Sequence, residues 1–97
     1  MHLVHIHLGP HPDGLPFPAG TDVAGTVVRS AAPAATVRHV SVHTEDGAGP
    51  VIGLYLLAPE PAAAGTAACI AWWSAVAARP ELGGWPFLRA EPAPTLS

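Results

Sequence analysis

Residues 36–58 read TVRHVSVHTEDGAGPVIGLYLLA, two apolar stretches separated by a turn. In residues 36–44 apolar and polar side chains alternate, which is typical of a strand with one face on a core. Residues 51–58 are apolar at odd and even positions alike (on both parities), as expected for a central strand. Glycine, proline and acidic residues fill positions 45–50, so the whole stretch predicts a β-hairpin.

Two further strands are expected on either side of this hairpin. Residues 2–8 alternate in the same way, and residues 85–90 follow a glycine pair. With one helix before the hairpin and one after it, the element order is β-α-β-β-α-β. Right-handed crossovers place both helices on one face of a four-stranded antiparallel sheet in the strand order 4-1-3-2. The sequence therefore predicts a single α+β domain over residues 1–97.

Capping and helix-breaking residues delimit the two helices. The first is expected to begin near Thr21 or Asp22, either of which can cap free N–H groups, and to end at Pro33. The second is expected to begin near Pro61 and to end at Pro80. Its expected apolar face is Cys69, Trp72, Trp73 and Val76. Residues 91–97, with two prolines, are expected to form an extended tail.

Histidines are concentrated on one parity of two strands. The more apolar parity, which should face the helices, consists of Val4, Ile6, Leu8, Val40 and Val42. The opposite parity carries Val37, Ser41 and four histidines, His5, His7, His39 and His43. The third strand should separate the two histidine rows by roughly 10 Å, which disfavours one metal ion bound by all four imidazoles. The histidines are candidate proton carriers, metal ligands or ligand-orienting groups, or have no catalytic role.

Further candidate binding residues lie on the third and fourth strands. If Gly53 faces the same side as the histidines, a trench opens between their rows with Tyr55 beside it. Trp85, Phe87 and Arg89 share one parity of the last strand. They are expected to supply an aromatic wall and one fixed positive charge to the open face.

Composition excludes several classes of protein. The formal charge is −3 and there is no basic stripe, so nucleic-acid binding is not expected. Cys69 is the single cysteine, which excludes an internal disulfide. No signal peptide is expected, and residues 62–78 are short and weakly hydrophobic for a membrane span. We therefore expect a cytoplasmic protein without a membrane association.

The element order and length resemble the broad ferredoxin-like group, and within it the small dimeric α/β-barrel proteins. In these proteins two sheets pack through their open faces. The group includes cofactor-independent monooxygenases, cyclases and isomerases of aromatic compounds. The resemblance covers most of the chain but matches no diagnostic motif, so it implies a fold and a mode of pairing and assigns no functional residue.

Three functions follow as hypotheses. The first is a small accessory protein that binds a ligand or partner through the open sheet face, as a homodimer or with another protein. The second is a cofactor-independent enzyme of the dimeric-barrel kind acting on a small aromatic or polyketide-like molecule. In it the four histidines would carry protons, and Arg89 or Tyr55 would orient the substrate. The third is a histidine-based metal-binding module. No cofactor is expected.

Overall fold

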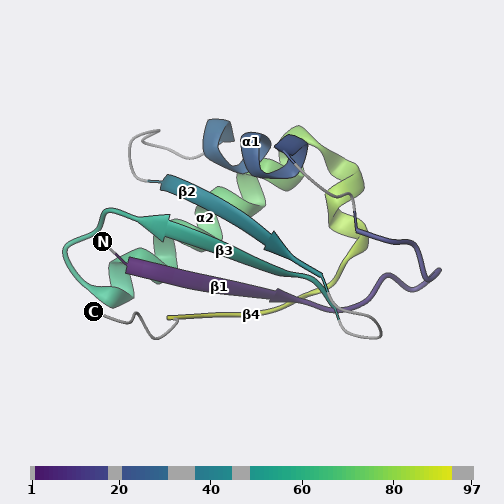
Figure 1. The fold of residues 1–97 in the computed structure, drawn as a ribbon, viewed down its shortest axis with the longest axis horizontal. Helices are drawn as coiled ribbons and strands as arrows, with labels where there is room; N and C mark the ends of the chain where they lie inside the picture. The colour runs from purple at the N-terminus through teal and green to yellow at the C-terminus, as the bar shows by residue number, and fades with distance from the viewer. Residues whose placement is uncertain (1, 18–20, 31–36, 45–48, 93–97) are drawn as a thin grey trace.

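The computed structural model describes residues 2–17, 21–30, 37–44 and 49–92. These form an α+β structure with a four-stranded antiparallel sheet and two α-helices (Figure 1). The elements in chain order are β1 (His2–Leu8), α1 (Thr21–Ser30), β2 (Val37–His43), β3 (Val51–Leu56), α2 (Pro61–Ala78), the 3₁₀ helix η2 (Pro80–Gly84) and β4 (Phe87–Pro92). The expected turn at 45–48 and the expected helix end at residue 33 lie outside the described residues.

The strand order across the sheet is β2-β3-β1-β4, so β1 and β3 occupy the centre. β3 pairs antiparallel with both β1 and β2, and β1 also pairs antiparallel with β4. Residues directly opposite one another in such pairs share a face of the sheet. The register therefore determines which side chains meet on each face.

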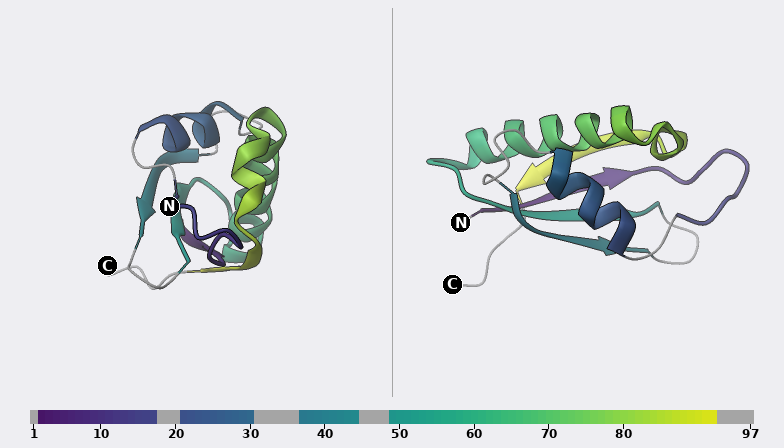
Figure 2. Two further views of the ribbon diagram at one scale, coloured as in Figure 1. Left: turned by 90° about the vertical axis from the view of Figure 1, so that its right-hand side faces the viewer. Right: turned by 90° about the horizontal axis from the view of Figure 1, so that it is seen from above.

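Both α-helices lie on the same side of the sheet (Figure 2). α1 packs on β2 and on α2, and α2 packs on β1, β3 and β4. The core between these layers includes Ile6, Ile52 and Leu54 from the central strands and Val23 and Val27 from α1, each at 0% exposure. The other side of the sheet is covered by no helix of the described chain.

α2 faces the sheet with small residues and one tryptophan. Its buried residues are Ala64, Ala68, Ala71, Trp72 and Ala75. Of the expected apolar face, Trp72 is fully buried and Val76 packs partly buried against the core. Cys69 is half-buried and Trp73 is 51% exposed, so that face reaches the core only in part. By length and composition alone α2 could cross a membrane, a test that core helices of globular proteins also pass.

A bulge in β2 changes the side of one valine. The register shifts between Val37 and His39, which pair with Leu56 and Tyr55, respectively. Arg38 is the extra residue, and such a residue reverses the alternation that follows it. Val37 is therefore 4% exposed in the core, contrary to the prediction that it shares a face with His39.

A second bulge corrects the prediction for β4. The register shifts between His7 and Leu8, so that Phe87 pairs with the buried Leu8 while Arg89 pairs with His7. Phe87 consequently lies on the helix side, where its ring is 5.5 Å from that of Trp73. Only Arg89 of the three expected β4 residues reaches the open face.

Trp85 precedes β4 and belongs to the core. It is 7% exposed, and its ring contacts those of Phe17 at 4.9 Å and His11 at 5.0 Å. The indole therefore fixes the loop after β1 onto η2. The prediction that it forms an aromatic wall on the open face was wrong.

Candidate functional site

The open face of the sheet consists of three rows of paired side chains. The middle row is His5, Gly53 and Ser41, the row on one side is His7, Val51 and His43, and the row on the other is Leu3, Tyr55 and His39. β4 adds Arg89 opposite His7 and Glu91 opposite His5. The four histidines predicted to share this face therefore do so, on β1 at the centre and on β2 at the edge.

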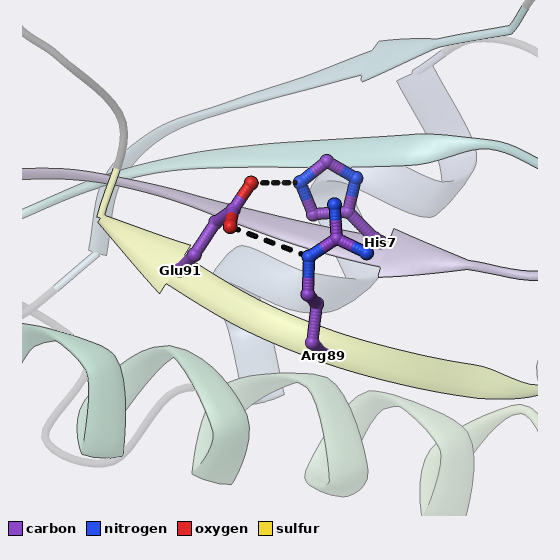
Figure 3. A network of polar contacts seen from close by, with 3 residues as sticks. All are labelled: His7, Arg89 and Glu91. Carbon is purple, nitrogen blue, oxygen red and sulfur yellow. Dashed lines mark hydrogen bonds and ion pairs between the residues drawn. The ribbon is translucent and has the colours of Figure 1, made fainter.

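Glu91 is a site residue that the sequence reading missed. Nε2 of His7 lies 2.8 Å from Oε1 of Glu91, and Nε of Arg89 donates to Oε2 of the same carboxylate at 3.3 Å (Figure 3). Nε2 of His7 is buried and makes no hydrogen bond within the described residues, so its contact with Glu91 is close but is not directed as a hydrogen bond. The shared parity of Arg89 and Glu91 was the available signal, but Glu91 had been assigned to the tail.

The hydrogen bond from Arg89 lowers the pKa of Glu91 below the usual value of a carboxyl, and His7 lowers it further. Glu91 is therefore ionised at neutral pH. Its charge offsets that of Arg89, so β4 places one fixed charge of each sign beside β1.

His5 lies at the middle of the face in a less favourable setting for a charge. Burial lowers its pKa below the usual value of imidazole, and protonated His7 and His43 would lower it further. Its ring is 6.1 Å from the ring of His7, with the planes at 79°. Burial and the neighbouring histidines thus disfavour a charge on His5, whose ring lies beside that of His7.

Gly53 faces the open side, and the space above it is filled by its neighbours. A Cβ on Gly53 would be 2.8 Å from Oγ of Ser41 and 3.6 Å from Cδ2 of His5. Ser41 in turn hydrogen-bonds Nε2 of His43 at 3.1 Å. The glycine therefore produces no empty trench. It lets polar groups of β1 and β2 converge over β3.

Tyr55 lies at the other end of the face, beside His39. Their ring centroids are 6.1 Å apart and the rings are tilted by 47°. Tyr55 is half-buried, whereas His39 is exposed. This pair is separated from the His7–Glu91 contact by the central row, so the site residues form an extended surface instead of one compact cluster.

The histidines of a single chain do not complete a metal site. Within residues 2–17, 21–30, 37–44 and 49–92, no group of three or more histidine, cysteine, aspartate or glutamate side chains could hold a metal ion. Cys69 lies on α2 as a free, half-buried thiol on the other side of the sheet. Any metal bound on this face would need ligands from elsewhere.

The chain matches no known family model, no curated protein and no solved structure. The function must therefore be inferred from the open face itself.

Proposed function

We propose that this chain is a small binding protein that associates through the open face of its sheet, with a second copy of the same chain as partner. One observation supports the proposal most: the face extends over four strands, and no helix or strand of the described residues covers it. Along the central strands β1 and β3 it carries Leu3, Val51, Tyr55 and the imidazoles of His5 and His7, with the Arg89–Glu91 ion pair near one edge. Depletion of charge at the centre is the compositional mark of interfaces.

The architecture supports the same reading. Two helices on one face and central strands β1 and β3 are the arrangement of a ferredoxin-like sandwich, and we assign the chain to that fold on this basis. In dimeric α/β-barrel proteins the open faces of two such sheets pack together. That packing would bury the half-exposed apolar side chains of Leu3, Val51 and Tyr55 and enclose the histidines.

Sedimentation equilibrium over a concentration series tests this proposal. The wild-type chain should have the mass of a dimer, and Val51→Glu should raise the dissociation constant at least about tenfold, because each copy would have to desolvate an added carboxylate at the interface. Thr66→Glu, on the exposed side of α2, is the matched control and should leave the dimer intact. A wild-type chain that stays monomeric, or equal effects of both variants, would refute the proposal.

A second function is favoured by the His7–Glu91 contact of 2.8 Å. A carboxylate-held imidazole beside the neutral His5 is a suitable acid and base for moving a proton on a small aromatic or polyketide-like molecule. Arg89 or Tyr55 would orient that small molecule on the face. A panel of naphthols and β-dicarbonyl compounds should then show a bell-shaped pH profile of turnover that His5→Ala and His7→Ala abolish. Unchanged turnover in both variants would exclude this chemistry.

A further inference from the structure

His5 and His7, which face the open side from β1, have their rings close to the separation of two ligands of one metal ion. Their ring centroids are 6.1 Å apart at 79°. Two imidazoles bound to tetrahedral zinc, with Zn–N distances of about 2.0–2.1 Å, place their ring centroids roughly 5 Å apart. His5 and His7 are within about 1 Å of that separation, so a small rotation of the side chains would suffice.

The carboxylate of Glu91 prepares one of these rings for coordination. It lies 2.8 Å from Nε2 of His7, so Nδ1 is the nitrogen of this ring that is left for a metal ion. Metal-bound histidines commonly have such a partner on the second nitrogen, which fixes the tautomer and the ring orientation. His43 has a serine hydroxyl in this position instead, and lies on an edge strand.

One chain supplies only two of the four ligands that zinc prefers, since no third group in the described residues completes the set. β1 is a central strand, so His5 and His7 lie near the middle of the open face. A two-fold axis that runs between the two packed faces, next to His5 and His7, would bring the same two residues of a second copy opposite them. The pair would then become four imidazoles.

We propose that His5 and His7 of two chains together bind one divalent transition-metal ion, with zinc as the representative, at the centre of the sheet-to-sheet dimer. The inference rests on the proposed association through the open face. Neutral imidazoles suit zinc, copper and nickel. Metal binding would make the dimer tighter, because the ion is bound by both copies and by neither alone.

Calorimetric titration of the tag-free full chain with zinc, together with sedimentation equilibrium in zinc and in a chelator, tests this inference. We expect one zinc per two chains and a dimer dissociation constant at least about tenfold lower in zinc than in chelator. His5→Ala and His7→Ala should each abolish stoichiometric zinc binding. Glu91→Gln should weaken it about 10–100-fold, as loss of such outer partners does.

His43→Ala is the matched control, since it removes a histidine from the same face at its edge and should leave the stoichiometry unchanged. Circular dichroism establishes that each variant is folded.

A dimer that binds no zinc overturns the metal site and leaves the proposed function standing. A monomer under both conditions overturns both. One zinc per chain in a monomer, or stoichiometric zinc in His5→Ala, overturns the bridging site.

Discussion

Two glycines illustrate how single residues determine the packing. A Cβ at Gly49 would overlap the backbone carbonyl oxygen of Leu8, whereas a Cβ at Gly65 in α2 would meet nothing within 4 Å. Gly49→Ala should therefore lower the free energy of unfolding by about 1–3 kcal/mol, because backbone must move. Gly65→Ala should raise it by about 0.5–1 kcal/mol, since alanine favours the helix. Urea denaturation measures both, and effects of equal sign would contradict this packing.

His5 should make stability sensitive to mild acid. Its folded pKa is lowered by burial and by His7 and His43, with Glu91 acting in the opposite direction. The unfolded chain therefore binds the proton more readily, so stability should be full above about pH 6.5 and fall as the pH drops through the folded pKa. Histidine ring resonances followed by NMR in chelator should give a His5 pKa below that of free imidazole.

His7→Gln tests whether His7 lowers the pKa of His5, because the substitution removes a group whose positive charge disfavours a proton on His5. The His5 pKa should then rise toward its usual value. A His5 resonance that titrates at or above the ordinary imidazole value in the wild-type chain would contradict this description of the face.

At the scale of elements, alternation predicted β1 and the histidine side of β2 because both strands follow period two over those residues. It failed for Val37 and for Phe87, where bulges insert an extra residue into β2 and β4. A bulge depends on how two strands pair, and neither strand alone encodes it. Glu91 was missed for the same kind of reason, since only pairing with β1 extends β4 to Pro92.

The two adjacent tryptophans of α2 allow a matched comparison. Trp72 is 1% exposed in the core, whereas Trp73 is 51% exposed and packs on Phe87. Trp72→Ala should cost about 3–5 kcal/mol of stability through the cavity it leaves. Trp73→Ala should cost about 1 kcal/mol or less, as expected for a partly exposed residue. Denaturation followed by circular dichroism separates them, and equal losses would mean that both rings are buried.

At the scale of the whole molecule, the decisive feature is the difference between the two sides of the sheet. One side is packed against α1 and α2 (Figure 2), and the other carries histidines with half-buried apolar side chains. The sequence indicated this asymmetry, because apolar residues on the two predicted strands share a parity. It did not indicate which polar groups would meet across strands, since the contact between Glu91 and His7 joins strands distant in the chain.

Burial of the open face between two copies is the central claim, and an isotope-filtered NOE experiment tests it most directly. In a mixture of labelled and unlabelled chains, cross-peaks between copies should arise from Leu3, Val51 and Tyr55. Cross-peaks confined to Ile70 and Trp73, which are exposed on α2, would place the interface on the opposite side of the molecule. That result, or no cross-peaks at millimolar concentration, would contradict the account.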